Sequence, residues 1–383
     1  MTREKLKVCV FTAGRSDYFL LKPLLKKINE SSECSLKLVA GSMHFSQEFG
    51  NTYQLIKDDG IHIDYKIQSS KKGGDNQEAL LSMSDDLAQY SYILPKIKPD
   101  ICVLLGDRYE VLAFAIACHI LRIPIAHIHG GELSYGSFDD ASRHAITKLA
   151  QIHFPATEEY RRRIIQMGEH PNSVVNVGAL AVENSYKTKD LSIAEISRKL
   201  KTNLRDQYFL VTMHPETNHP KNDTKNISIL VETLQNFPEY DVIWTISNAD
   251  PNGSCINKFL SNTKGFHLIN NLGDIYIPVM KQAKAIIGNS SSGIIEAPIA
   301  GIPTVNIGNR QGGRIRCASV FDCPFDSKLI SQTIERCLVK NHCPSEHPYG
   351  HGNTSILIIK DLINYAFKTS NEFYNLLLSE ETI

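Results

Sequence analysis

The sequence predicts an α/β fold made of two Rossmann-like domains, each a doubly wound parallel sheet. Its 383 residues are long for one hydrophobic core and typical of two domains. Short apolar runs alternate with amphipathic stretches from end to end, as in repeated strand–helix units. The apolar runs are rich in Val, Ile and Leu with little alternation, which is typical of parallel strands covered by helices on both faces.

The strand-like runs form two series. The first is Lys7–Thr12, Leu36–Ala40, Ile101–Leu105, Ile125–Ile128, His153–Ala156 and Val174–Val177. The second is Tyr208–Thr212, Asp241–Ile246, His267–Asn270, Ala285–Gly288 and Thr304–Ile307. Helices are predicted between them, among others at Leu20–Glu30, Ala141–Gln151, Asn226–Gln235 and Ile294–Ala300. Because the ligand of an open α/β sheet binds beyond the carboxyl ends of the strands, the informative residues should follow these runs.

Polar, helix-prone sequence at about Gly178–Arg205 interrupts this rhythm and marks the predicted domain boundary. We therefore expect a first Rossmann-like domain at residues 1–180 and a second at residues 181–360. The amphipathic stretch Asn353–Leu378 predicts a C-terminal helix, assigned to residues 361–383, that can pack back across both domains.

The composition bounds the partners and the compartment. Lys plus Arg and Asp plus Glu both number 41, which argues against a nucleic acid as the main partner and leaves room for a small phosphate ligand. No stretch approaches the ~18–20 apolar residues of a membrane span, and the polar N-terminus lacks the apolar core of a signal peptide. The nine cysteines are scattered without a CxxC pair, so we expect reduced thiols in a cytoplasmic protein without membrane association.

Side chains suited to proton transfer follow strands of the first half. Asp107 comes directly after Ile101–Leu105, where it fits a general acid or base, or equally a helix cap paired with Arg108. Two histidines, His127 and His129, share one face of the next strand. The turn Gly130-Gly131-Glu132 comes next, followed by Asp139-Asp140 and Arg143-His144. This concentration predicts a proton-transfer centre. A metal site on the histidine pair is a rival, although in metal-dependent amidohydrolases such a pair lies on the first strand of a barrel.

Features suited to phosphate binding follow strands of the second half, and Arg15 after the first strand can also reach a phosphate. His214 directly follows a strand and can donate to a phosphate or a leaving group. Ser290 and Ser291 lie in a small polar loop between a strand and a helix, where amides and hydroxyls form a phosphate site. Glu296, one turn further, can accept hydrogen bonds from both hydroxyls of a ribose. We therefore expect a substrate that bridges a cleft between the domains.

Several motifs occur in a specific order along the chain. They are Arg15-Ser16-Asp17-Tyr18, Gly106-Asp107-Arg108, His129-Gly130-Gly131-Glu132, Asp139-Asp140 through Arg143-His144, His214-Pro215, Gly288-Asn289-Ser290-Ser291-Ser292-Gly293 and Gly308-Asn309-Arg310-Gln311. Over about Lys7 to Arg314, this set resembles the hydrolysing UDP-N-acetylglucosamine 2-epimerases of bacterial sialic acid pathways.

The resemblance implies a GT-B-like fold with a UDP-sugar in the cleft between the domains, and UDP as a product. The implied ligands of UDP are Arg15, Arg108, His214, Asn248, Ser290, Ser291, Glu296 and Arg310. The implied reaction needs no metal or other cofactor: UDP is eliminated as a base removes the C2 proton, and water then adds to give N-acetylmannosamine. The resemblance also suggests a homodimer or homotetramer.

The same resemblance assigns proton transfer to Asp107 and Asp139, joined by Glu132 and His129. Several members carry Glu where this chain has His129, so that group's role must pass here to His129, Glu132 or Asp139. The spacing from Glu132 also leaves Asp140 as an alternative to Asp139.

Four other functions remain open at this point. Hydrolysing epimerases of legionaminic acid pathways share these motifs and act on a UDP-diacetamido-trideoxy sugar, UDP-N,N'-diacetylbacillosamine. A non-hydrolysing epimerase would return a UDP-sugar, and a retaining glycosyltransferase would need an acceptor. A catalytically inactive UDP-sugar sensor would not need the acidic residues that this chain retains.

Overall fold

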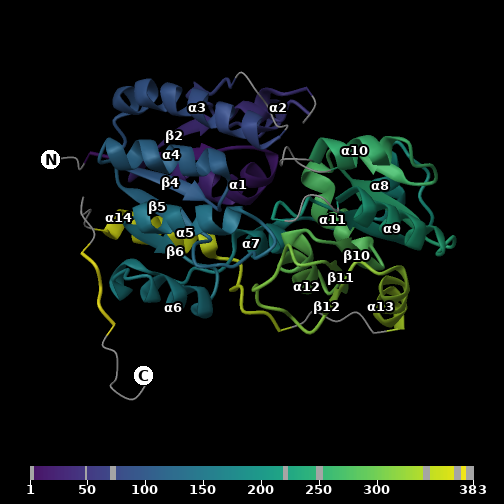
Figure 1. Cartoon of the computed structure of the whole chain (residues 1–383). Helices are drawn as coiled ribbons and strands as arrows, with labels where there is room; N and C mark the ends of the chain where they lie inside the picture. Colours follow the sequence, from purple (N-terminus) through teal and green to yellow (C-terminus); the bar gives the residue numbers. More distant parts are fainter. Residues whose placement is uncertain are drawn as a thin grey trace, which may run out of the picture.

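The structure is a computed structural model that describes residues 4–47, 50–69, 75–218, 223–246, 253–339, 346–365 and 372–376. Within these residues the chain forms two six-stranded sheets, one in each half, with helices packed on them (Figure 1). Neighbouring strands pair in parallel in both sheets. The predicted fold class of two doubly wound parallel sheets is confirmed.

The first sheet has the strand order β3-β2-β1-β4-β5-β6. Its strands are β1 Leu6–Thr12, β2 Cys34–Ala40, β3 Tyr65–Lys66, β4 Ile101–Leu105, β5 Ile125–Ile128 and β6 Ile152–Phe154. Its helices are α1 Arg15–Glu30, α2 Tyr53–Asp58, α3 Asn76–Ile97, α4 Tyr109–Ile120, α5 Asp139–Leu149 and α6 Glu158–Gln166. The strand order reverses between β1 and β4, which is where such sheets open a crevice for a ligand.

The second sheet repeats this topology, with the order β12-β11-β10-β7-β8-β9 and the reversal between β7 and β10. Its strands are β7 Tyr208–Thr212, β8 Asp241–Thr245, β9 His267–Ile269, β10 Ala285–Gly288, β11 Thr304–Ile307 and β12 Val320–Cys323. The helices are α8 Ile193–Leu200, α9 Asp223–Gln235, α10 Gly253–Ser261, α11 Tyr276–Gln282, α12 Glu296–Ala300 and α13 Ser327–Val339. The carboxyl ends of both sets of central strands therefore supply the loops of the site.

The central strands are buried on both faces, which explains their lack of alternation. In β1, Val8 and Val10 belong to one hydrophobic cluster, whereas Cys9 and Phe11 belong to another on the opposite face of the sheet. All four side chains are buried. The seven cysteines whose side chains the structure describes are likewise buried and free. No described helix combines the length and the apolar character that crossing a membrane requires.

The end of the chain returns to the first sheet. Helix α14, Thr354–Asn364, contacts α1 and α7, Leu180–Lys187. The buried Glu183 of α7 fixes this packing, since its carboxylate accepts from the backbone and the hydroxyl of Ser355 at 2.8 and 2.6 Å. The described residues 372–376 beyond α14 are not helical, so the helix is shorter than the amphipathic stretch suggested.

Other element predictions also need correction. The stretch Val174–Val177 forms only one bridge, to His153, because its neighbour Pro155 has no N–H to extend the ladder. The edge strands β3 and β12 were not predicted. The helix predicted at Ile294–Ala300 is shorter, since a 3-10 turn at Ser291–Gly293 precedes α12.

Candidate functional site

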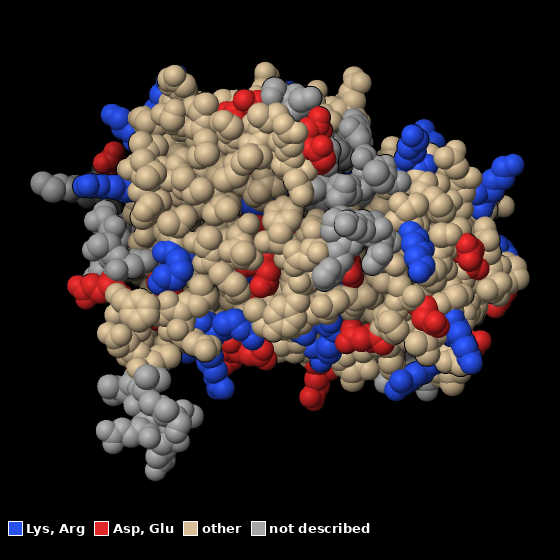
Figure 2. Space-filling view, in the orientation of Figure 1, with Lys and Arg blue, Asp and Glu red and all other residues tan. Residues whose placement is uncertain are grey.

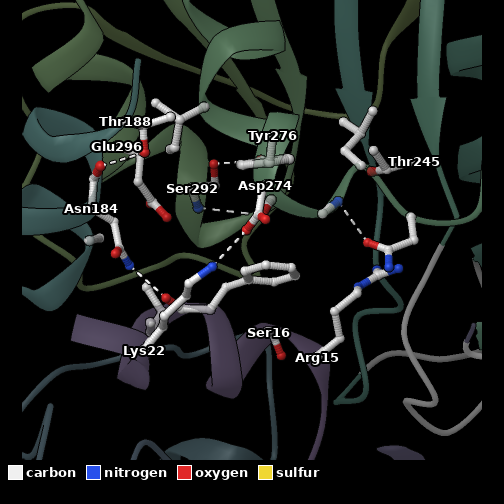
Figure 3. A pocket seen from close by; sticks show the side chains of 18 of the residues that line it. Arg15, Ser16, Lys22, Asn184, Thr188, Thr245, Asp274, Tyr276, Ser292 and Glu296 are labelled. Atoms are coloured by element: carbon white, nitrogen blue, oxygen red, sulfur yellow. Dashed lines mark hydrogen bonds and ion pairs between the residues drawn. The ribbon is translucent and has the colours of Figure 1, made fainter. Parts of the chain in front are cut away.

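A cleft of about 650 Å³ lies between the two domains (Figure 3). Helices α1 and α7 contribute to one side, and the loops that follow β7, β8, β9 and β10 contribute to the other. The predicted ligands that line it are Arg15, His214, Ser290, Ser291 and Glu296. Arg108 and Arg310 lie beyond this lining, and Asn248 falls outside the described residues.

Two basic side chains of α1 connect the domains across this cleft. Nη1 of Arg15 donates to the carbonyl oxygen of Asn270, which follows β9. Burial lowers the pKa of the Arg15 guanidinium. Two helical turns further, Lys22 contacts Asp274 of the second domain at 3.1 Å and Asp59 of the first at 2.7 Å. These contacts join the two domains across the cleft.

The loops after β7 and β10 are fastened to each other behind His214. Gly288 ends β10 with φ +134°, and a Cβ at this position would lie 2.0 Å from the carbonyl oxygen of Thr212. The fully buried Asn289 then accepts from the backbone N–H of His214 at 2.8 Å and donates to its carbonyl oxygen at 2.9 Å. Glycine is therefore required for the close approach, and the Asn289 amide fixes the backbone that carries His214.

Glu296 occupies the wall of the cleft close to Tyr276 and Ser292 (Figure 3). Burial raises the pKa of the Glu296 carboxyl to about 7. The hydroxyls of Tyr276 and Ser292 are hydrogen-bonded at 2.6 Å, and burial together with the charge of Glu296 raises the pKa of Tyr276. This wall thus offers a carboxylate and two hydroxyls to a polar ligand. Tyr276 was not predicted because it follows no strand.

Asp139 lies at a second place where the domains meet, a small cavity that it lines together with Arg108 and Arg310. Asp139 is the first residue of α5, and its Oδ2 accepts from the Ser137 hydroxyl at 2.7 Å. The arginine from the second domain is positioned through its backbone, because the buried Glu216 carboxylate accepts from the Arg310 N–H at 3.1 Å. An arginine from each domain therefore lines the same small cavity as Asp139.

Arg143 connects several acidic and loop residues of the first domain and is almost fully buried. Its guanidinium pairs with the Asp107 carboxylate and lies 3.0 Å from Oδ1 of Asp140. It also donates to the carbonyl oxygen of Glu132 at 3.0 Å and to the Ser134 hydroxyl at 2.9 Å. The sequence motif contained Arg143, but its central position depends on folding and was not predicted.

The two adjacent aspartates of α5 therefore occupy different surroundings. Asp140 accepts from the Ser134 backbone N–H at 2.5 Å and pairs with Arg143. Burial opposes its ionisation, but His144, the Ser134 N–H and Arg143 outweigh burial and hold the pKa of the Asp140 carboxyl at about 2. Asp140 is thus an anchor within its own domain, whereas Asp139 borders the junction between the domains.

A buried ion-pair chain crosses from the first domain to the second. Nδ1 of His129 donates to Oε1 of Glu132 at 2.5 Å, and Oε2 of the same carboxylate accepts from Arg314 at 2.9 Å. All three side chains are nearly excluded from solvent. Burial raises the pKa of Glu132, but the positive charges of Arg314, His129 and Arg143 outweigh it and hold that pKa at about 2. Arg314 was not among the site residues predicted from the sequence.

The predicted acid–base residues lie next to the predicted nucleotide-binding residues but do not line the same cleft. Asp107, His129, Glu132 and Asp139 do not line the large cleft. The connection runs through Asn289, whose carbonyl oxygen accepts from Arg310 at 3.3 Å. The predicted nucleotide-binding residues thus adjoin the predicted acid–base residues at the domain junction.

The geometry of His127 does not suit the alternative of a metal site. Its Nε2 donates to the carbonyl oxygen of Gly106 at 2.7 Å, and its Nδ1 lies 3.1 Å from the Thr147 hydroxyl. Burial lowers the pKa of His127 to about 3, so it is a neutral structural histidine with both ring nitrogens engaged. In the part of the chain that the structure describes, no group of three His, Cys, Asp or Glu side chains is arranged to hold a metal ion.

Comparisons with known proteins are consistent with this geometry. The sequence profile of the family described as UDP-N-acetylglucosamine 2-epimerase matches residues 26–363. A Campylobacter jejuni protein named GDP/UDP-N,N'-diacetylbacillosamine 2-epimerase (hydrolyzing) is 38% identical over 87% of this chain and 88% of its own. The Escherichia coli polysialic acid biosynthesis protein P7 is 34% identical over 97% of both chains. The Methanocaldococcus jannaschii UDP-GlcNAc 2-epimerase, solved with UDP-GlcNAc and UDP, has the same fold, with a TM-score of 0.77 at 20% identity over 94% of this chain and 99% of its own.

Proposed function

The chain belongs to the UDP-N-acetylglucosamine 2-epimerase family, and we propose that it converts UDP-N-acetylglucosamine and water to UDP and N-acetylmannosamine. The resemblance inferred from the sequence is thereby confirmed. The chain is a hydrolysing UDP-sugar 2-epimerase, the enzyme class named for its relatives from Campylobacter jejuni and Legionella pneumophila. The observation that carries the proposed reaction is the cleft between the domains, with candidate nucleotide-binding groups beside a junction of carboxylates and arginines.

In this proposal the cleft holds the nucleotide. Glu296 accepts from the ribose hydroxyls, and Ser290 and Ser291 contact the diphosphate together with Arg15 and His214, all of which line the cleft. Cationic and N–H donors aimed at the departing diphosphate stabilise the charge that develops as UDP leaves. Solved structures of similar fold are described as complexes with UDP or UDP-GlcNAc, which supports this placement.

The reaction proceeds in two halves. A base removes the C2 proton, the C2–H electron pair forms the C1=C2 bond, and the C1–O bond breaks with its pair leaving on UDP. Water oxygen then bonds to C1 and a proton returns to C2 from the opposite face, which gives the free epimeric sugar. Of the two α5 aspartates we propose Asp139 for proton transfer, because Asp140 is held by Arg143 and the Ser134 backbone.

Proton NMR of the purified chain with UDP-N-acetylglucosamine in deuterated water tests the function. We expect UDP and free N-acetylmannosamine that carries deuterium at C2. A UDP-linked epimer without free sugar would show a non-hydrolysing enzyme, and unchanged substrate would refute the proposed sugar.

A second substrate, UDP-N,N'-diacetylbacillosamine, has specific support because two relatives at 38% and 30% identity carry its name. The discriminating measurement is kcat/KM for both UDP-sugars under identical conditions. A ratio above ten in favour of the diacetamido sugar would transfer the proposal to that substrate. No turnover of either would refute the assignment of the reaction.

We also propose that this enzyme is cytoplasmic and that it forms a homodimer or homotetramer. Exposed apolar side chains lie on α3 and at the end of α4: Leu80, Leu81, Tyr92 and Ile120. Charged residues are sparse over these two helices (Figure 2). Light scattering coupled to size exclusion measures the oligomeric state, and a monomer at micromolar concentration would refute the proposal.

A further inference from the structure

The contacts of Glu132 and His129 distinguish a residue that holds a charge from a residue that exchanges a proton. The sequence had named both as candidates for proton transfer. Glu132 uses both carboxylate oxygens, one for His129 and the other for Arg314 of the second domain. A general base needs a lone pair that can reach the proton it removes. Because both oxygens are engaged and the carboxyl stays ionised down to very low pH, Glu132 is suited to holding a charge rather than to exchanging a proton.

His129 is oriented differently. With Nδ1–H directed at Glu132, the neutral imidazole carries its lone pair on Nε2. Among the described residues Nε2 is buried and has no hydrogen-bond partner. A carboxylate that fixes the tautomer and stabilises the imidazolium is the arrangement by which a histidine acts as a base.

The backbone supports a functional position for His129. Its φ is +67°, in the left-handed region that few residues other than glycine adopt. Its N–H is held by the carbonyl oxygen of Phe154 at 3.1 Å, which fixes the turn after β5. Strained conformations that the surrounding structure holds in place are concentrated at active sites.

We propose that His129, through Nε2, is the base that removes the C2 proton in the elimination half-reaction, and that Glu132 is its positioning residue. This inference rests on the proposed function. The C2 proton bonds to Nε2 as the C2–H pair becomes the C1=C2 bond and the C1–O pair leaves on UDP. The resulting imidazolium is stabilised by Glu132 and later returns its proton to solvent.

The base and the nucleotide side of the site are linked through the second domain. Arg314 of that domain holds one oxygen of Glu132, the carboxylate that orients His129. The nucleotide side is near, because the charges of His129, Arg314 and Glu132 all act on the carboxyl of Glu296 in the cleft wall. The titratable and charged groups that act on the His129–Glu132 pair are Arg143, Arg314, Glu296, Tyr160 and Tyr349.

The test compares His129→Gln and His129→Glu with the wild-type enzyme. For His129→Gln we expect kcat to fall 10²- to 10⁴-fold, the range for loss of a general base, with the Kd for UDP changed less than twofold. For His129→Glu we expect partial recovery of kcat and an acid limb of kcat/KM at lower pH. For Glu132→Gln we expect a smaller loss and an acid limb also moved to lower pH, because the imidazolium loses its counter-charge.

The hydration half-reaction provides the second readout. Supplied with the unsaturated acetamidoglycal and UDP, His129→Gln should form the free sugar within threefold of the wild-type rate, because another group protonates C2. His119→Gln, on the exposed end of α4, is the matched control and should behave as wild type. Thermal melting checks that each variant is folded.

Wild-type kcat and an unchanged acid limb in His129→Gln would overturn the inference, as would equal loss of both half-reactions. A wild-type enzyme inactive on both UDP-sugars would instead refute the proposed function.

Discussion

Replacing Glu296 by glutamine should separate the instability of a buried carboxylate from its role in binding ribose. Burial raises the pKa of this carboxyl from its ordinary 4.5 to about 7. Below pH 4.5 the group is protonated in both the folded and the unfolded chain. Between pH 4.5 and 7 only the unfolded chain loses the proton, so the free energy of unfolding falls across this window and levels off above pH 7.

The size of this effect follows from the pKa. A rise from 4.5 to about 7 corresponds to an upper limit of about 3 kcal/mol. Because the side chain is only partly buried in the cleft wall, we expect about 1–2 kcal/mol. Glutamine cannot ionise, so Glu296→Gln should be more stable than wild type by this amount at pH 8 and by little at pH 5.

The single tryptophan makes the measurement specific to one domain. Trp244 is fully buried on β8, in the core of the domain that carries Glu296, so its fluorescence during urea unfolding reports that domain. The exposed Glu335 on α13 is the matched control, and Glu335→Gln should change stability by less than about 0.5 kcal/mol at either pH. A stability gain for Glu296→Gln that is equal at pH 5 and pH 8 would refute the reasoning.

Calorimetric titration should show UDP binding about 10- to 100-fold weaker in Glu296→Gln, as expected for loss of hydrogen bonds to a charged group.

Three further outcomes are expected. Gly288→Ala should destabilise the second domain by more than about 3 kcal/mol. The control is Gly265→Ala, which should cost about 1 kcal/mol because Gly265 also has positive φ but a Cβ there would contact no other atom. Trp244 fluorescence during unfolding measures both changes. Asp139→Asn should lower kcat at least 100-fold with unchanged UDP affinity. Asp140→Asn should instead lower the unfolding free energy by about 2 kcal/mol above pH 4. The wild type itself loses this contribution as the pH falls from 4 to 2 and Asp140 becomes protonated. Turnover should be unaffected by excess EDTA, and loss of activity reversed by added metal would restore the metal hypothesis.

The predictability of each strand from the sequence depended on the source of its stability. The strands Ile101–Leu105 and Ile125–Ile128 have the bounds predicted, because burial on both faces leaves a continuous apolar run in the sequence. The edge strand Tyr65–Lys66 has only two residues and exists through pairing with β2, so its own sequence carries no such signal.

The residues of the candidate site also differ in how far the sequence could predict them. His214 and Glu296 could be selected because the sheet topology brings the carboxyl ends of its strands to one edge. Arg143 and Arg314 could not, because their partners are set by how loops and domains meet. Arg314 in particular could not be assigned a role, because its partner Glu132 belongs to the other domain.

The contacts between the domains indicate why one cleft can support two successive half-reactions. The second domain supplies Arg314, which pairs with Glu132, and Arg310, which lines the same small cavity as Asp139. The acid–base groups are therefore completed only when the domains are together, and a bound nucleotide is the ligand that both domains can share. Closure would also exclude water during elimination, so that the glycal forms before hydration begins. In the proposed reaction, the ion pairs that cross the domain boundary would couple proton transfer to closure of the domains on the nucleotide.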